Sequence, residues 1–307
     1  MNAVHENFTQ ELDPRWRKYV VGTGRLEPTD STLRFVVRPG ASTPARTYSD
    51  AQIDDYQGLP RRRFPWRPPL RLSVRARFSH PAAAGSCTGG GLQGTAGFGF
   101  WNDPFLMTGV PGARVPTLPR AVWFFYGSPP SNMKLDLQTP GCGWKAATVD
   151  ALRPAALLLA PSAPLAVLLM NVPLLYRALW PPIQRALKVR EAMVNGPDAR
   201  TGVADFDRAS GSMSAVSAPF AMTEWHTYVV DWGVDRACFT VDGTPVLTGA
   251  PSPRGPLGFV MWLDNQYMVA KPWGRLGWGL LDVPDRQWME VDWLAIEPGA
   301  GGSDARV

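Results

Sequence analysis

Apolar and polar residues alternate most regularly over Leu70–Phe78, where every second residue is apolar and each residue between is polar. This period of two predicts a β-strand with one buried face. Residues 225–232 run through a short turn into residues 237–243, whose closing Asp-Gly pair leads into residues 244–246. Because Asp-Gly favours the tight turn of a hairpin, we predict three consecutive strands of an antiparallel meander.

Five further apolar stretches are bounded by Gly, Pro or Asn, which are common turn residues. Many short strands separated by turns are typical of a β-sandwich or jelly roll. We therefore predict an all-β fold, an antiparallel jelly-roll sandwich that forms a single domain over residues 1–307. The five stretches are Leu33–Val37 and residues 97–101, 121–126, 258–263 and 287–296.

Composition agrees with this fold class. The chain has 307 residues, of which 45% are hydrophobic and 19% charged, so it can bury a substantial core and is not disordered. Its 30 Gly and 31 Pro follow no G-X-Y period, which excludes collagen. The 13 Trp and 13 Phe are large apolar side chains that suit a pleated surface.

The pattern changes between residues 150 and 195. Residues 155–160 and 165–170 are apolar runs, and residues 183–194 have helical spacing, so we predict a helical, apolar insertion over 150–195. Residues 154–176 carry no charge, as in a membrane span, but Pro161, Pro164 and Pro173 would each interrupt a spanning helix. Two interpretations stay open, a helical hairpin packed on the sandwich and a segment that binds a membrane surface or a protein partner.

The net charge of +5 is a mild excess, and its one basic run is Arg61, Arg62 and Arg63. Without a recognition motif beside this run, we do not expect nucleic acid as a partner. The first residues have no basic start followed by an apolar run, so we expect no signal peptide and a cytoplasmic protein, with association with a membrane as the alternative. Cys87, Cys142 and Cys238 lack metal-site spacing, and we expect small buried thiols rather than disulfides.

Three segments carry a resemblance to a known family. Residues 224–232 read E-W-H-T-Y-V-V-D-W and are followed by Val241, Asp242 and Gly243; residues 288–296 form the second segment and residues 98–103 the third. In their order and spacing these segments resemble family-16 glycoside hydrolases, of the concanavalin A-like lectin and glucanase group. The resemblance implies a concave sheet that binds a polysaccharide.

The same resemblance implies retaining hydrolysis by two glutamates in an E-x-D-x-x-E motif on one strand. This sequence lacks the motif: none of its seven glutamates lies between residues 28 and 190, and residues 121–126, in the place of the catalytic strand, carry no carboxylate. We therefore expect a non-hydrolytic protein that binds a carbohydrate, a glycoconjugate, or another polyhydroxy or aromatic ligand. His226, which matches the histidine of the family's hairpin, is expected to be a hydrogen-bonded sheet residue.

Aromatic rings stack on the apolar faces of sugars, and a few polar side chains bind the hydroxyl groups. The alternative for each aromatic is a place in the core, and for each Asp or Asn the capping of a turn. The expected ligand-binding residues are Trp101, Asn102, Asp103, Trp123, Phe125, Trp262, Asp264, Asn265 and Tyr267.

Two further options remain. A hydrolase could use a relocated carboxylate pair from Asp103, Asp136 and Asp264, one of them with a pKa raised by burial. The resemblance also implies a structural calcium ion beside Asp292 in the last strand, held otherwise by backbone oxygens. No other cofactor is expected.

Overall fold

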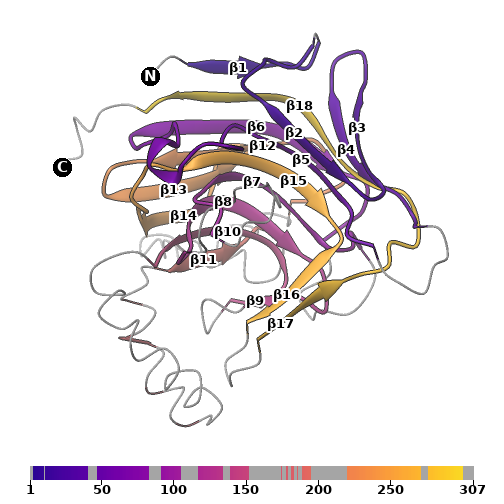
Figure 1. Cartoon of the computed structure of the whole chain (residues 1–307). Coiled ribbons are helices and arrows are strands. Elements are labelled where there is room, and N and C mark those ends of the chain that lie inside the picture. The colour runs from indigo at the N-terminus through magenta and orange to yellow at the C-terminus, as the bar shows by residue number, and fades with distance from the viewer. Residues whose placement is uncertain are drawn as a thin grey trace, which may run out of the picture.

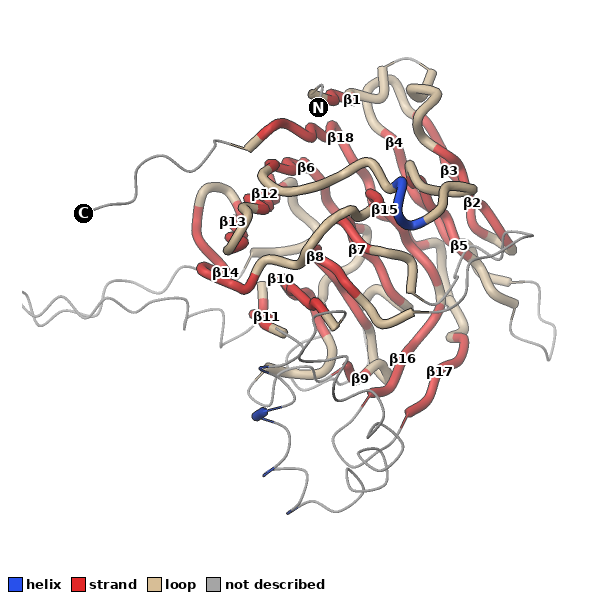
Figure 2. The backbone as a smooth tube through the Cα atoms, turned by 60° about the vertical axis from the view of Figure 1, so that its left-hand side comes forward, coloured by secondary structure: helices blue, strands red, loops and turns tan. Residues whose placement is uncertain are grey.

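The computed structural model describes residues 3–9, 11–40, 47–82, 91–104, 117–133, 139–151, 189–194, 220–270 and 276–299, with five isolated positions between 174 and 185. Over these residues the chain forms two large antiparallel sheets stacked face to face, seen as two curved layers in Figures 1 and 2. The protein is thus an all-β jelly-roll sandwich, which confirms the predicted fold class.

Sheet A contains eight strands among the described residues. The short β1 (Val4–Glu6) pairs with β18, beside the main path of the sheet. The path runs β14 (Thr244–Pro251), β13 (Arg236–Val241), β12 (His226–Trp232), β6 (Leu70–Phe78), β18 (Gln287–Pro298), β4 (Leu33–Val37) and β3 (Gly24–Pro28).

Sheet B contains seven strands in the same described part of the chain. Their order is β11 (Arg190–Met193), β10 (Gly143–Asp150), β8 (Arg120–Gly127), β7 (Thr95–Trp101), β15 (Gly258–Asp264), β5 (Asp50–Asp54) and β2 (Arg17–Val21). A small sheet of β17 (Leu276–Leu280), β16 (Gln266–Ala270) and β9 (Asn132–Met133) lies beyond the end of β15, which continues into β16 (Figure 1). One 3₁₀ turn, η1 (Arg61–Arg63), is the blue segment that precedes β6 in Figure 2.

The core lies between the two sheets and contains one face of every long strand. Phe98, Phe124 and Trp144 of sheet B meet Tyr228 and Phe239 of sheet A, with ring centroids 5.2–5.9 Å apart. Because side chains alternate along a strand, the residues between them face away from the core. Sheet B therefore has a second, outer face, where the candidate site is found.

The strands predicted from alternation are confirmed. The bounds of β4 and β6 agree with the prediction at both ends, and the meander is β12, β13 and β14. Asp242 and Gly243 have φ angles of 49° and 78°, the left-handed backbone that an Asp-Gly hairpin turn requires. His226 is a hydrogen-bonded sheet residue, with Nδ1 2.6 Å from Asp242 Oδ2.

Part of the predicted insertion is wrong. Arg190–Met193 is the edge strand β11 of sheet B, although residues 183–194 have helical spacing. Pairing with β10 decides the backbone here, because it buries Glu191 against Lys145 at 3.2 Å. The positions 174, 178, 181, 182 and 185 are helical, and the rest of 152–188 lies outside the described residues. Within the described residues, no helix is long and apolar enough to cross a bilayer.

The expectation of free thiols is wrong for one cysteine. Cys142, just before β10, is disulfide-bonded, and its partner lies outside the described residues. Cys238 is a free, half-buried thiol. Because disulfides persist mainly in oxidising compartments, the expected cytoplasmic location gains no support from the structure.

Candidate functional site

The outer face of sheet B is aromatic at its centre. Gly97 and Gly99 of β7 face outward here, and their missing side chains leave room above the strand. A Cβ on Gly97 would lie 2.8 Å from the Trp262 ring, and one on Gly99 would lie 2.5 Å from Trp123 Cβ. Trp262 of β15 and Trp123 of β8 therefore meet across β7, with ring centroids 5.5 Å apart.

Four rings form a continuous surface on this face, which we call the aromatic platform: Trp101, Trp123, Phe125 and Trp262. Trp123 is central, 5.6 Å from Trp101 and 5.4 Å from Phe125, on which it stacks. Phe125 and Trp262 are 5.9 Å apart. The four rings are separate from the core between the sheets, and Trp123 and Phe125 are only half-buried. Such rings can stack against the apolar face of a ligand.

Two carboxyl groups face each other beside the platform. Asp50 of β5 and Asp264 of β15 are direct cross-strand partners, and both side chains lie on the outer face because Ala51, Ile53 and Leu263 enter the core. Directly opposed residues of an antiparallel pair have Cβ atoms about 4.5–5.5 Å apart. Asp50 is 2% exposed and Asp264 is 4% exposed. We call them the aspartate pair.

The two members of the pair have different partners. Oδ1 of Asp264 accepts three hydrogen bonds, from Thr95 N at 3.1 Å, Thr95 Oγ1 at 2.8 Å and Gln266 N at 3.0 Å. Asp50 accepts one, from the Tyr48 hydroxyl to Oδ2 at 2.7 Å. Oδ1 of Asp50 is buried and has no hydrogen-bond partner among the described residues. Donors stabilise the charged form of a carboxyl group, so Asp264 ionises before Asp50.

Burial raises the pKa of both carboxyl groups, and the nearby charge of Asp264 raises that of Asp50 further, well above its ordinary range. In Asp264 the bonds from Thr95 and Gln266 oppose the effect of burial. Burial, and then the charge of Asp50, also raise the pKa values of Tyr19 and Tyr48. As the pH rises, Asp264 therefore loses its proton before Asp50, and the charge on Asp264 opposes ionisation of Asp50.

The platform and the pair are joined by hydrogen bonds. Trp262 Nε1 donates to Thr95 Oγ1 at 2.9 Å, and the same hydroxyl donates to Asp264. Trp262 and Asp264 are two positions apart on one strand face, about 7 Å along the strand. The orientation of the Trp262 ring is thus fixed relative to the carboxylate.

A third acid lies on the same strand as Asp50. Asp54 of β5 is fully buried and accepts bonds from Gln52 Nε2 at 2.9 Å, Tyr56 N at 3.1 Å and Gln57 N at 2.8 Å. Burial raises its pKa to about 6 in spite of these donors, and the charge of Asp103 contributes. Asp50 and Asp54 lie on the same face of β5 with Gln52 between them, so the acids form a row beside the platform.

The predicted site residues divide between this face and its surroundings. Trp101, Trp123, Phe125, Trp262 and Asp264 come together on the outer face of sheet B, as described above. Whether each contacts a ligand stays a prediction.

The two predicted asparagines are bound to backbone. Asn102 accepts from Arg120 N at 2.8 Å and donates to Leu118 O at 3.0 Å. Asn265 accepts from Ser49 N at 2.9 Å and donates to the carbonyls of Thr47 and Leu281, each at 3.0 Å. These contacts use the amide groups to hold loops at the ends of sheet B.

The remaining predicted residues lie outside the aromatic platform and the aspartate pair. Asp103 is buried, with a φ of 44°, and its carbonyl accepts from Arg61 Nη2 at 2.5 Å. The Tyr267 ring of β16 covers Gly279 of β17. Asp292, on the outer face of sheet A, forms an ion pair with Arg75 at 3.4 Å. Asp136 lies outside the described residues.

No cluster of three potential metal ligands from His, Cys, Asp and Glu occurs among the described residues. A calcium ion held mainly by backbone oxygens beside Asp292 stays a prediction. The Arg75 guanidinium, which already approaches the Asp292 carboxylate, would compete with such a cation.

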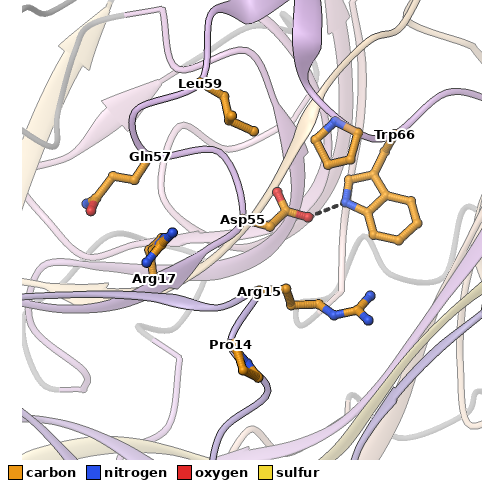
Figure 3. A pocket seen from close by; sticks show the side chains of 8 residues that line it. Pro14, Arg15, Arg17, Asp55, Gln57, Leu59 and Trp66 are labelled. Atoms are coloured by element: carbon orange, nitrogen blue, oxygen red, sulfur yellow. Dashed lines mark hydrogen bonds between the residues drawn. The ribbon is translucent and has the colours of Figure 1, made fainter.

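A hollow of about 470 Å³ lies at the β2 edge of sheet B (Figure 3). Asp55 lies at its centre, where Trp66 Nε1 and Phe259 N, the latter at 2.8 Å, donate to its carboxyl group. Arg15 and Arg17 lie on its rim in Figure 3. Burial raises the pKa of Asp55 to about 7. The bonds of Asp55 fix the loop after β5 to β15.

Asp50, the member of the aspartate pair that lies on β5, was not predicted from the sequence. Asp50–Asp54 reads D-A-Q-I-D, with acids at two of five positions, and no apolar run marks it as a strand. The available signal was alternation, because the apolar Ala51 and Ile53 face the core in a short two-residue period.

Comparison with known proteins gives no family for this chain. No family model matches it, and no curated protein does. Among solved structures, it is similar to LamAcat from Zobellia galactanivorans, with 12% identity, 96% of each chain covered and a TM-score of 0.47. A β-1,3-1,4-glucanase (lichenase) derived from a mouse hindgut metagenome has 12% identity, 97% of this chain and 100% of that chain covered, and a TM-score of 0.44. The β-glucanase of Bacillus licheniformis has 12% identity, 97% and 98% covered, and a TM-score of 0.41.

Proposed function

We propose that the outer face of sheet B binds a carbohydrate. The aromatic platform is the observation that carries this proposal, because four contiguous rings with two half-buried members offer a stacking surface outside the core. Asp264 beside it supplies an acceptor for a hydroxyl group, since its Oδ2 receives no hydrogen bond among the described residues. Stacking rings with a few convergent polar groups are typical of a sugar site.

The ligand that fits best is a neutral polysaccharide. Asp50, Asp54 and Asp264 lie on this one face, and a polymer of acidic sugars would be repelled by their charge. Few basic side chains lie on the described part of this face: Lys145 forms an ion pair with Glu191, and Arg17 lies on the edge strand β2 opposite Asp54.

Binding can be tested with soluble β-glucans and galactans by affinity electrophoresis and intrinsic tryptophan fluorescence. Trp123→Ala should weaken binding by at least about fivefold, since one stacked ring contributes on the order of 1 kcal/mol or more. The matched control is Trp225→Ala on the outer face of sheet A, where the ring contacts Arg75 and Arg77. Equal losses in the two variants, or no binding by the unmodified protein, would refute the proposal.

A further inference from the structure

The hollow at the β2 edge lies apart from the aromatic platform and the aspartate pair (Figure 3). Its volume of about 470 Å³ is within the range of small-molecule sites. The segment that leads into β2 forms one side, and the loop between β5 and β6 forms the other. No lining residue belongs to the platform or the pair. The lining residues are Pro14, Arg15, Arg17, Asp55, Gln57, Leu59, Pro65 and Trp66.

Two arginine side chains on the rim have donors left for a ligand. Arg15 forms an ion pair with Asp13 at 3.1 Å, but the two side chains are 40% and 41% exposed, so water screens the pair. The exposed Arg17 side chain forms no hydrogen bond or ion pair with another described residue, although Asp54 is its cross-strand partner. Guanidinium groups in this state can bind a carboxylate or a phosphate.

A third donor lines the same hollow. Nε2 of Gln57 is buried and has no hydrogen-bond partner among the described residues. The backbone N of Gln57 donates to Asp54 at 2.8 Å, which fixes the residue in the turn after β5. Gln57 and Arg17 lie on the same side of Asp55 in Figure 3. A buried amide without an acceptor costs free energy, and a ligand that supplies an acceptor removes that cost.

The remaining walls are apolar. Leu59 is 36% exposed, and its side chain points toward the centre of the hollow in Figure 3. Trp66 Nε1 donates to Asp55, which fixes the indole ring beside the hollow. Pro14 and Pro65 complete the apolar surface. Walls of this kind bind the apolar body of a ligand, while a few polar groups bind its charged end.

The acid at the centre does not exclude an anion. Trp66 Nε1 and Phe259 N donate to its two oxygens, and burial raises the pKa of Asp55 to about 7. Near neutral pH it therefore carries less negative charge than an ordinary carboxyl group. The neighbouring Asp54 has a pKa of about 6, and three donors hold its carboxyl group. Arginine stays charged at these pH values, so the rim of the hollow is positive.

The basic run of the sequence lies on one of the walls. The turn η1 is part of the loop that carries Leu59 and Trp66. Arg61 donates to the carbonyl of Asn102 at 2.8 Å, while Arg62 and Arg63 are exposed. Their charges add to the positive potential around the hollow, which attracts anions from solution.

We propose that this hollow binds a small molecule that carries an oxyanion group, a carboxylate or a phosphate, on an apolar body. Arg15 and Arg17 donate to the oxyanion, and Gln57 Nε2 donates to a further acceptor atom. The apolar body lies between Leu59 and Trp66. This second site is independent of carbohydrate binding on the outer face of sheet B.

Isothermal titration calorimetry of the full chain tests the ligand class with phenyl phosphate, benzoate, inorganic phosphate and benzyl alcohol. At least one of the two aryl anions should bind about fivefold or more tightly than benzyl alcohol, which has the same ring without the charge. The tighter of the two identifies the oxyanion group. Inorganic phosphate lacks the apolar body and should bind more weakly than phenyl phosphate.

Two variants test the residues. Arg17→Gln should weaken binding of the tighter aryl anion by at least about tenfold, because hydrogen bonds between charged groups are strong. The matched control is Lys18→Gln: Lys18 is the next residue of β2, is also exposed and does not line the hollow. It should change binding by less than about twofold, because exposed charges outside the site are screened. Leu59→Ser should weaken aryl binding by about threefold and leave inorganic phosphate unchanged.

Three results would overturn the proposal: no binding of either aryl anion, equal binding of benzyl alcohol, or equal losses in Arg17→Gln and Lys18→Gln, which would indicate attraction by net charge alone. Thermal unfolding shows whether Arg17→Gln is folded. If it is not, Arg15→Gln, at the second exposed position, is expected to give a similar loss. Polysaccharide binding should be unchanged in all of these variants, so failure of either proposal is seen separately.

Discussion

Glu290 on the outer face of sheet A and Asp50 on the outer face of sheet B are both buried acids, but they differ in their partners. On sheet A, Glu290 accepts from Arg34 at 2.9 Å, from Arg77 at 2.8 Å and from Thr32 at 2.8 Å. Although burial alone would raise its pKa, these bonds lower it below the ordinary value. On sheet B, the pKa of Asp50 is raised well above its ordinary value by burial and by Asp264. Compensated charge stabilises a fold, whereas uncompensated charge next to a binding surface is typical of a functional site.

The aromatic residues show the same division. Trp225 and Trp288 on sheet A contact arginine guanidinium groups, with the Arg77 Cζ atom 4.7 Å from the Trp225 ring centroid. On sheet B, Trp101, Trp123 and Trp262 contact other rings and no cation among the described residues. Of the three, Trp123 is half-buried, so its ring is partly open to an uncharged ring such as that of a sugar.

The largest stability effect is expected at Glu290. Glu290→Ala would leave Arg34 and Arg77 without their shared carboxylate and should reduce the free energy of unfolding by about 3 kcal/mol. Urea denaturation at pH 7 measures this change. A loss below about 1 kcal/mol, as for an exposed ion pair, would show that the sheet A acids are not compensated in the way described.

The buried acids of sheet B should determine how the free energy of unfolding depends on pH. Asp54, with a pKa of about 6, and Asp50, whose pKa is higher still, bind more protons in the native state than in the unfolded chain above about pH 4. The free energy of unfolding should therefore fall between pH 5 and pH 8, and Asp54 alone accounts for about 1.4 kcal/mol of this fall, since one pKa unit corresponds to about 1.4 kcal/mol. Urea midpoints across this range test the sign, and a rise toward pH 8 would contradict it.

Removing one acid of the pair should stabilise the fold. Asp50→Asn eliminates a buried group that is costly to ionise, keeps an acceptor for Tyr48, and places an amide donor opposite Asp264. We expect a gain of about 1–2 kcal/mol at pH 8, as is common when a functional group is replaced. The gain should shrink at pH 5, where Asp50 is protonated; equal urea midpoints for variant and parent at pH 8 would argue against the pair.

The smallest effect is expected for an exposed pair of sheet A. Asp231 and Arg71 are bidentate partners at 2.6 and 3.0 Å, yet their side chains are 39% and 52% exposed. Asp231→Asn should change the free energy of unfolding by less than about 1 kcal/mol, and added salt should reduce the difference. Thermal melts at low and high salt give both values.

The sequence predicted the fold well because most long strands have one apolar face. Leu33–Val37 and Leu70–Phe78 were predicted with correct bounds, since a period of two is a strong signal. Arg190–Met193 was predicted helical and is a strand, because its conformation depends on pairing with β10, which is distant in sequence.

The sequence predicted the aromatic residues and Asp264 of the site, but it did not predict Asp50. The aromatic positions and Asp264 follow apolar strands and could be placed, but Asp50 lies on a strand that looks polar in sequence, and its partner is 214 positions away. The pairing of two acids depends on the strand order of sheet B, where β5 lies next to β15, and local patterns carry no information about that order. The disulfide of Cys142 was missed for the same reason.

The place of β18 in the middle of sheet A has a consequence for how the chain folds. β18 lies between β6 and β4, and the Arg34 and Glu290 side chains that bond across this boundary are 256 positions apart. During synthesis, the edges of β4 and β6 that pair with β18 therefore stay unpaired until residues 287–298 have been made. Contacts between such distant residues slow folding, and unpaired edges favour aggregation. Folding of this sandwich should thus be completed late, after its last strand is available, and should benefit from chaperones that cover those edges.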